Sequence, residues 1–302
     1  MPPIPAPREF GTTRTTDEPL YWAKYGIAGA PPLLVLHGGP GAHHDYLLPQ
    51  MLALGGAGGG RELLFYDQRG GGRSRTSALE VITWMTQVRD LAAVIREFAL
   101  GAPTIVGYSW GALLALLYAA EAARDTSMPA PAALALVDPA PISRRHRDVF
   151  EREFARRQNG SDVARLREEL AASGLRARDA DAYRQRTFEL SVAGYFANMA
   201  SARDLTPFRV SARVQQSVWE SLSEFDLAAD GRLKSIRAPT LITHGRQDPI
   251  PLASSEECAR AMGARLVIIE NCGHVPYVEQ PAALFGALDS FLRETGGTGD
   301  RG

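Results

Sequence analysis

Residues 103–120 read PTIVGYSWGALLALLYAA, and no other stretch of the chain narrows the possible folds as far. The apolar run 103–106 predicts a buried strand, and the apolar residues after Gly111 predict a buried helix. Gly107 and Gly111 flank Ser109, since only small residues avoid a clash where a strand turns sharply into a helix. The stretch therefore predicts a strand, a tight turn that carries Ser109, and a helix.

A serine in this position has a chemical use. Gly-x-Ser-x-Gly between a strand and a helix is the nucleophile elbow of the α/β-hydrolase fold. The turn lifts the hydroxyl clear of the sheet, and the N-terminus of the helix favours negative charge beside it. We therefore predict that Ser109 is a catalytic nucleophile in a chain with this fold.

Strand-like apolar runs alternate with helical patterns along most of the chain, which is typical of an α/β protein with a mostly parallel central sheet. The expected strands are residues 33–36, 62–66, 104–106, 133–137, 239–243 and 265–269, after an antiparallel edge hairpin formed by 8–16 and 20–26. Between 143 and 236 the pattern is helical, without a strand signal. We expect residues 1–142 and 237–302 to form the α/β-hydrolase core, and 143–236 to be an inserted all-helical cap.

Two further catalytic residues are expected after later strands, because the order along the chain in this fold is serine, acid, histidine. Asp248 follows the strand at 239–243, and His274 follows the strand at 265–269. Both lie on loops at the carboxyl ends of strands, where ligand sites gather in open α/β sheets. We predict that His274 is the base and that Asp248 orients it. Asp138, at the end of an earlier strand, is the alternative acid.

Acyl transfer also requires two backbone N–H groups that hold the oxyanion. The N–H of Trp110, directly after Ser109, is expected to be one of them. The loop HGGPG at 37–41 is expected to supply the other, because glycines let the backbone approach the reacting carbon.

The chain resembles the proline iminopeptidase family of α/β-hydrolases. The resemblance is carried by HGGPG at 37–41, DQRGGGRS at 67–74, GYSWG at 107–111 and the loops of Asp248 and His274. HDYLL at 44–48 is most similar to the tricorn-interacting aminopeptidases of this family. The resemblance implies that Gly39 and Trp110 supply the oxyanion donors and that the loop 67–74 braces the site. It also implies release of an N-terminal residue from a small peptide or amide.

The carboxylates that would hold a substrate amine depart from the family pattern. Family aminopeptidases bind the free α-amino group through glutamates, one in the cap and, in the tricorn-interacting branch, one directly after the catalytic aspartate. Here Pro249 takes the latter position, and the cap stretch VAGYF at 192–196 lacks the acid of a similar family motif. Glu189 and Glu220 are the remaining candidates for binding the amine. The alternative is that both side chains only lie on solvent-exposed helix faces.

These features predict a serine hydrolase that cleaves an amide or ester bond of a small molecule or short peptide through an acyl-enzyme. An aminopeptidase similar to the proline iminopeptidases is the first expectation. An esterase or lactonase acting on a small apolar substrate without a free amine is the alternative. A non-catalytic ligand receptor on the same fold is a third hypothesis, which the complete catalytic constellation disfavours.

Composition argues against other classes of protein. The 302 residues carry a net charge of −1, so no basic excess indicates a nucleic-acid partner. The start of the chain has no apolar signal core, and no apolar run reaches the roughly 20 residues of a membrane span. A cytoplasmic protein without membrane contact is therefore expected. The histidines lack the spacing of a zinc site, so neither a metal nor a cofactor is expected. The glycine-rich stretch 55–60 precedes a strand, which predicts a flexible connector.

Overall fold

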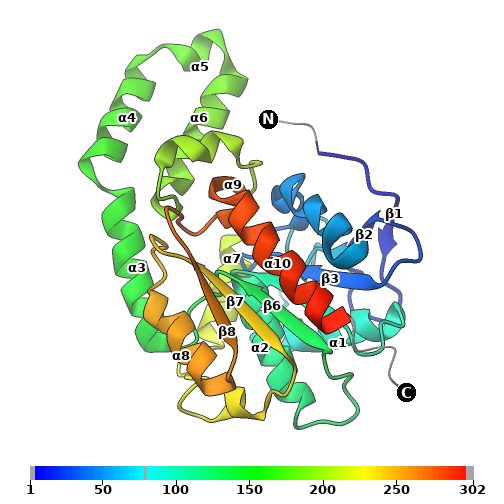
Figure 1. The fold of residues 1–302 in the computed structure, drawn as a ribbon. Helices are drawn as coiled ribbons and strands as arrows, with labels where there is room; N and C mark the ends of the chain where they lie inside the picture. The colour runs from blue at the N-terminus through cyan, green and yellow to red at the C-terminus, as the bar shows by residue number, and fades with distance from the viewer. Residues whose placement is uncertain (1–3, 78–79, 297–302) are drawn as a thin grey trace.

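An eight-stranded sheet forms the centre of the computed structural model, which describes residues 4–77 and 80–296. The strands are β1 (Glu9–Thr12), β2 (Tyr21–Gly26), β3 (Pro32–Leu36), β4 (Glu62–Tyr66), β5 (Thr104–Tyr108), β6 (Ala133–Val137), β7 (Thr240–Gly245) and β8 (Arg265–Ile269). They lie in the order β1-β2-β4-β3-β5-β6-β7-β8 (Figure 1). Strands β3 to β8 pair in parallel, whereas β2 is antiparallel to both its neighbours. The expected fold class, a mostly parallel sheet with an antiparallel edge, is confirmed.

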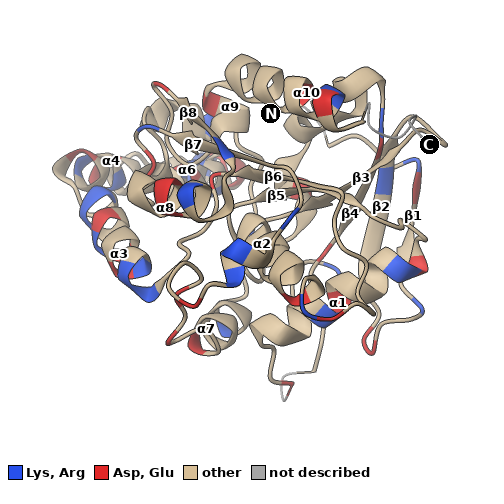
Figure 2. Cartoon of the chain, turned by 60° about the horizontal axis from the view of Figure 1, so that its bottom comes forward, with Lys and Arg blue, Asp and Glu red and all other residues tan. Residues whose placement is uncertain are grey.

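Helices cover both faces of the sheet, which explains why the central strands β3 to β7 are almost entirely buried. One face carries α1 (Trp84–Glu97), α2 (Trp110–Ala122) and α8 (Leu252–Met262), and the other carries the 3-10 segment η2 (Gln50–Gly59) and α10 (Pro281–Gly296) (Figure 2). Side chains of β3 alternate between the two cores, Leu34 facing the first and Val35 the second. None of the helices in the described part of the chain is long and apolar enough to cross a membrane.

Helices replace strands between β6 and β7. They are α3 (Arg144–Gln158), α4 (Ser161–Ala172), α5 (Leu175–Arg178), α6 (Ala180–Val192) and α7 (Ala212–Glu220), with 3-10 turns η3 (Ala193–Tyr195), η4 (Met199–Asp204) and η5 (Arg232–Ser235). Figure 1 shows α4, α5 and α6 extending beyond one end of the sheet. We call residues 143–236 the cap segment. Its helical content agrees with the expectation, and its standing as a separate domain stays a prediction.

The glycine-rich stretch 55–60 is not the flexible connector that its composition predicts. Most of it lies in η2, which packs along α10. The N–H of Gly58 donates to Asp289 of α10 at 2.7 Å, and the N–H of Arg61 donates to the Gly55 carbonyl at 2.8 Å. The expectation was wrong because the stretch gains its order from a helix more than 200 residues away in the sequence.

Candidate active site

Ser109 lies at the sharp turn between β5 and α2. Its backbone has φ 54° and ψ −117°, a conformation that a residue with a side chain seldom adopts. A Cβ on Gly107 would lie 2.5 Å from the Gly111 carbonyl oxygen, and one on Gly111 would lie 2.3 Å from the carbonyl oxygen of Leu36. Both glycines are therefore required by close backbone approach, and the predicted strand–turn–helix is present.

A continuous chain of hydrogen bonds joins the serine, the histidine and the acid expected from the sequence. The Nε2 atom of His274 lies 2.9 Å from the Ser109 hydroxyl, and its Nδ1 lies 2.7 Å from Oδ2 of Asp248. The other oxygen of Asp248 accepts the N–H of Ile250 at 2.7 Å. Burial alone would raise the pKa of Asp248, but the charge and hydrogen bond of His274 lower it, so this carboxyl holds the negative charge.

The loop of His274 is held in place from two sides. Its backbone N–H donates to the carbonyl of Tyr195 in the cap segment at 2.7 Å, and its carbonyl accepts the Tyr108 hydroxyl at 2.9 Å. Glu279, at the end of α9 (Pro276–Glu279), accepts the N–H of Gly273 at 2.7 Å and that of Asn198 at 2.9 Å. One carboxylate thus ties the histidine loop to the cap segment. Sequence analysis missed Glu279, because no motif marks a carboxylate that binds backbone N–H groups.

The two residues expected to supply the oxyanion donors lie close to Ser109: Trp110 follows it directly, and Gly39 lines the same cavity. Trp110 is the first residue of α2, so its N–H has no acceptor within the helix. Gly39 lines the cavity at Ser109 with φ 133°, which favours glycine. The neighbouring N–H of Gly38 is already used, because it donates to the Tyr46 hydroxyl at 2.7 Å. The structure therefore brings the two expected donor residues, Gly39 and Trp110, to the serine.

Gln68 connects the two halves of this donor pair. Its side-chain amide donates to the His37 carbonyl at 2.8 Å and accepts the indole N–H of Trp110 at 2.8 Å. Burial lowers the pKa of His37 to about 4, so its ring is neutral. Its Nδ1 then donates to the Gly38 carbonyl at 2.7 Å, and its Nε2 accepts the Gln68 backbone N–H at 3.0 Å. These contacts give an atomic basis to the bracing that the resemblance implies for the loop 67–74.

The cavity above Ser109 is small and mainly aromatic. It encloses about 300 Å³, and its lining includes Tyr46 and Tyr108 of the core beside Phe154, Phe188 and Tyr195 of the cap segment. Phe208 and Tyr277 bring two more rings, and Gln215 and Ser191 add polar groups. Among the described residues, no carboxylate lines this cavity. Its chemistry suits an uncharged, apolar group.

The two glutamates expected to hold a substrate amine lie elsewhere. Glu189 is buried in α6, where it accepts hydrogen bonds from Arg186 at 2.7 Å and Gln185 at 3.1 Å. Glu220 is exposed at the end of α7 and accepts a hydrogen bond from Gln216 at 2.7 Å. Neither lines the cavity of Ser109. The structure brings together the serine, histidine, aspartate and donor residues, but not these two carboxylates.

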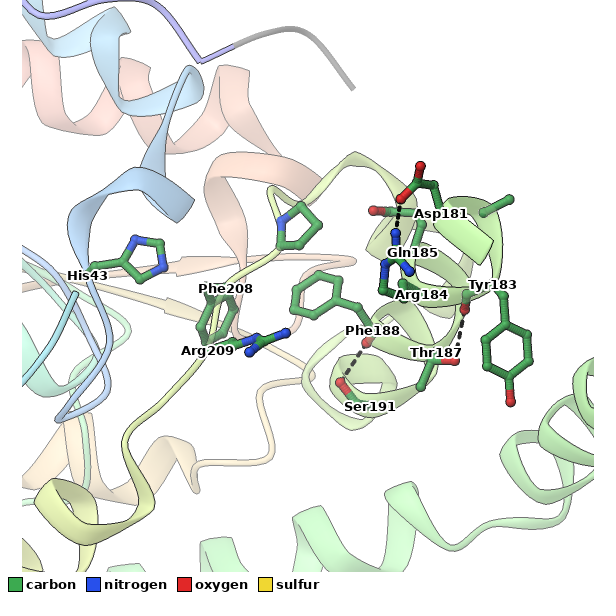
Figure 3. Close-up of a pocket in the computed structure, with 12 residues that line it drawn as sticks. His43, Asp181, Tyr183, Arg184, Gln185, Thr187, Phe188, Ser191, Phe208 and Arg209 are labelled. Atoms are coloured by element: carbon green, nitrogen blue, oxygen red, sulfur yellow. Dashed lines mark hydrogen bonds and ion pairs between the residues drawn. The ribbon is translucent and has the colours of Figure 1, made fainter. Parts of the chain in front are cut away.

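A larger groove opens outside the cavity, between α6 and the segment 207–209 that follows η4 (Figure 3). It measures about 940 Å³ and shares Phe188, Ser191 and Phe208 with the inner cavity. The rings of Phe188 and Phe208 meet edge to face, with centroids 5.6 Å apart. This aromatic pair therefore stands where the groove meets the cavity.

Comparisons with known proteins agree with this fold. Residues 33–287 match the alpha/beta hydrolase family. Proline iminopeptidase of Lactobacillus delbrueckii subsp. lactis is 26% identical over 285 residues, covering 86% of this chain and 90% of that protein. This match confirms the resemblance to proline iminopeptidases.

Solved structures share the fold at lower identity. Proline iminopeptidase of Mycobacterium smegmatis has a TM-score of 0.67 and 20% identity, with 95% of this chain and 98% of that chain covered. The enol-lactonase from Burkholderia xenovorans LB400 has a TM-score of 0.64 and 19% identity, with 93% and 99% covered. A peptidase and a lactonase are thus about equally similar in fold, so the fold alone does not select the bond that is cleaved.

Proposed function

Because this chain belongs to the alpha/beta hydrolase family, we propose that it is a serine hydrolase whose nucleophile is Ser109. The hydrogen-bonded chain from Ser109 through His274 to Asp248 is the observation that supports this proposal. Neutral His274 takes the hydroxyl proton as Ser109 attacks the substrate carbonyl carbon. Asp248 holds the imidazole in the required tautomer and stabilises the imidazolium that forms.

The remaining steps use groups that already surround the serine. The N–H groups of Gly39 and Trp110 hold the oxyanion of the tetrahedral intermediate. His274 then returns its proton to the leaving alcohol or amine, and the acyl group stays on Ser109. A water molecule, deprotonated by His274, attacks the ester carbon and releases the acid, which restores the serine hydroxyl. The outer groove is where we place the leaving group, since it continues the cavity past Phe188 and Phe208.

For the substrate, we propose an ester or lactone whose small apolar acyl part carries no free amine. The support is the aromatic cavity without a lining carboxylate among the described residues. An ammonium group moved from water into such a cavity would lack an opposite charge, which costs several kcal/mol. An apolar acyl group would gain free energy from the same burial.

An aminopeptidase is the second candidate, because the curated relative with 26% identity is a proline iminopeptidase. Aromatic faces attract cations, so the rings of the cavity are the groups that could receive a substrate ammonium here. This candidate requires that a free amine improve turnover rather than impair it.

A matched set of substrates separates the two candidates. The purified chain is assayed with p-nitrophenyl esters of short fatty acids, a small lactone, prolyl- and alanyl-naphthylamide, and the N-acetylated naphthylamides. We expect the amine-free esters to give the higher kcat/KM, and the Ser109→Ala variant to abolish every activity. Faster cleavage of free-amine substrates than of their N-acetylated forms would overturn the ester proposal and support the aminopeptidase. Absence of any turnover that depends on Ser109 would overturn the serine hydrolase itself.

A further inference from the structure

Asp138 is a buried carboxyl group that the proposed mechanism does not use. It directly follows β6, is fully buried, and has φ 44°. Its Oδ1 accepts the N–H of Gly245 at 2.7 Å. Its Oδ2 is also buried, but no donor group of the residues that the structure describes reaches it. Within the described ranges 4–77 and 80–296, no Lys, Arg or His side chain forms an ion pair with this carboxyl. An ionised carboxylate held this way would carry the full cost of losing its water.

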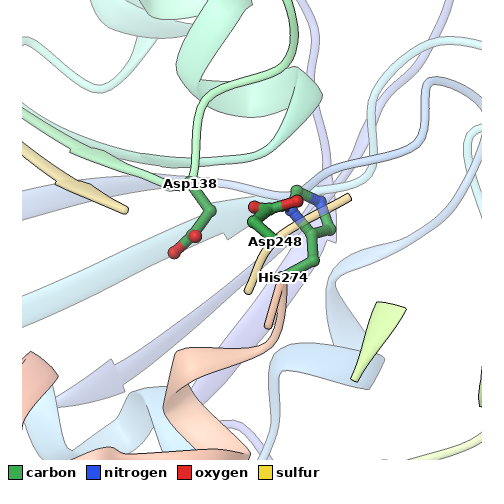
Figure 4. A group of neighbouring side chains, drawn as sticks. All are labelled: Asp138, Asp248 and His274. Carbon is green, nitrogen blue, oxygen red and sulfur yellow. Dashed lines mark hydrogen bonds and ion pairs between the residues drawn. The ribbon is translucent and has the colours of Figure 1, made fainter. Parts of the chain in front are cut away.

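The neighbour of this carboxyl group is Asp248, the acid of the hydrogen-bonded chain. Asp138, Asp248 and His274 each place one ligand atom within 4.8 Å of the others (Figure 4). An oxygen of Asp138 and an oxygen of Asp248 therefore lie within 4.8 Å of each other, both in buried side chains. Two carboxylates repel, so this contact is favourable only when one of them carries a proton.

The surroundings decide which carboxyl carries that proton. Asp248 receives two donors, the ring N–H of His274 and the backbone N–H of Ile250, which stabilise its charge. From the described part of the chain, Asp138 receives only the N–H of Gly245. Burial, and after it the charge of Asp248, raises the pKa of Asp138 well above its ordinary value. The proton therefore belongs on Asp138.

We propose that Asp138 is a positioning residue, which stays protonated and donates a hydrogen bond from its carboxyl group to Asp248. The role in turnover rests on the proposed function, whereas the protonation state does not. The bond would fix the Asp248 side chain from the side opposite His274. It would also reduce the negative charge on the oxygens of Asp248, which weakens the attraction between Asp248 and the imidazolium form of His274. The base is then neutral, and able to act, at a lower pH.

Other groups near Asp138 do not supply an opposite charge. Glu279 is the next carboxyl, and its charge further raises the pKa of Asp138. Tyr108, Tyr277 and Cys272 also lie close enough to interact, and burial raises the pKa of all three, so they are neutral. The acceptor that we assign to the protonated carboxyl of Asp138 is thus Asp248, which is itself hydrogen-bonded to His274.

Two substitutions test the proposal through the pH dependence of kcat/KM for a p-nitrophenyl ester. Asp138→Asn keeps an acceptor for the Gly245 N–H and a donor for Asp248. The rise of kcat/KM on the acid side of the pH profile (the acid limb) should therefore stay at the wild-type pH. Asp138→Leu removes the donor, which makes Asp248 a stronger partner for the imidazolium and should move the acid limb to higher pH by about one unit. If Asp138 were ionised, both variants would remove a negative charge near His274 and move the limb to lower pH. A downward shift in Asp138→Asn would therefore overturn the proposal.

A second measurement is independent of turnover and of the folding of the leucine variant. Infrared spectra of the wild type and of Asp138→Asn are compared at pH 8, where exposed carboxyl groups are ionised. We expect the wild type to show the carbonyl stretch of a protonated carboxyl, and the variant to lack it. If the wild type has no such band, or the variant retains it, the proposal fails even if the enzyme is an active serine hydrolase. If the band disappears in the variant while Ser109→Ala remains active, the protonated Asp138 stands and the proposed function fails.

Discussion

The cavity has two walls that are built differently. On the sheet side, the backbone of Ser109 and Gly39 has fixed positive φ angles, and His274 hydrogen-bonds to Ser109 and Asp248. Gln68 adds buried hydrogen bonds to the flanking residues His37 and Trp110. On the cap side, the wall consists mainly of rings.

The cap wall holds its residues by packing. Phe188 and Phe208 contact each other edge to face, and the ring centroids of Phe208 and Tyr46 lie 4.4 Å apart. The Ser191 hydroxyl donates to the Phe188 carbonyl of its own helix. Hydrogen bonds have a required geometry, whereas ring contacts tolerate shifts and substitutions. From this contrast we propose that the sheet side fixes the chemistry and that the cap side selects the substrate. Changes on the two sides should therefore affect different kinetic constants.

The largest effect is expected for Ser109→Ala on the sheet side. The variant should lose about 10⁴-fold or more in kcat, because the serine and its partners act as a unit. Its thermal unfolding should match that of the wild type, since the removed hydroxyl faces the cavity. Steady-state kinetics and a melting curve check both points, and retention of more than a tenth of the activity would contradict the mechanism.

The next effect compares the two buried aspartates. Asp248→Asn should lower kcat by about 10³- to 10⁴-fold, because an amide presents the wrong hydrogen-bonding group to His274. Asp138→Asn should be far less damaging, as it keeps both hydrogen bonds that we assign to Asp138. The two variants, measured side by side with the same ester, decide the acid. A greater loss in Asp138→Asn would place the catalytic acid one strand earlier.

An intermediate effect is expected for Gln68→Ala. The change removes the side chain that links the His37 carbonyl to the Trp110 indole, so the two oxyanion donors lose their common support. We expect kcat to fall by about 10- to 100-fold with little change in KM. Gln50→Ala is a suitable control, because that amide bonds to Asp204 on the surface. An unchanged kcat in Gln68→Ala would show that the donors keep their positions without it.

The smallest effect is expected on the cap side, for Phe188→Ala. Loss of one ring contact should raise KM for a short apolar ester by about tenfold, with kcat nearly unchanged. The opening between cavity and groove should also let longer acyl chains react better. Phe150→Ala serves as the control, since its ring packs on Phe154 and Tyr195 behind the cavity wall. A fall in kcat without a change in KM would break the division between the two walls.

The same division separates what the sequence reveals from what it does not. The elbow, the order of Ser109, Asp248 and His274, and the six core strands could be predicted, because each depends on local pattern and on strand order. The orientation of Glu189 could not, because it depends on how α6 packs against its neighbours.

Long-range contacts explain the other differences. Glu279 accepts three backbone N–H groups from two separate segments, and such a contact leaves no sequence motif. The order of residues 55–60 comes from α10 at the far end of the chain. Composition alone describes the local preference of such a stretch and not the partner that covers it.

The most direct test of the central claim is the intact mass of the protein after treatment with a fluorophosphonate, which reacts with an activated serine. The account predicts one adduct per chain, located on the peptide that contains Ser109, absent from Ser109→Ala and strongly slowed in His274→Ala. No adduct on the wild type, or an adduct on a different residue, would contradict a serine hydrolase that works through Ser109.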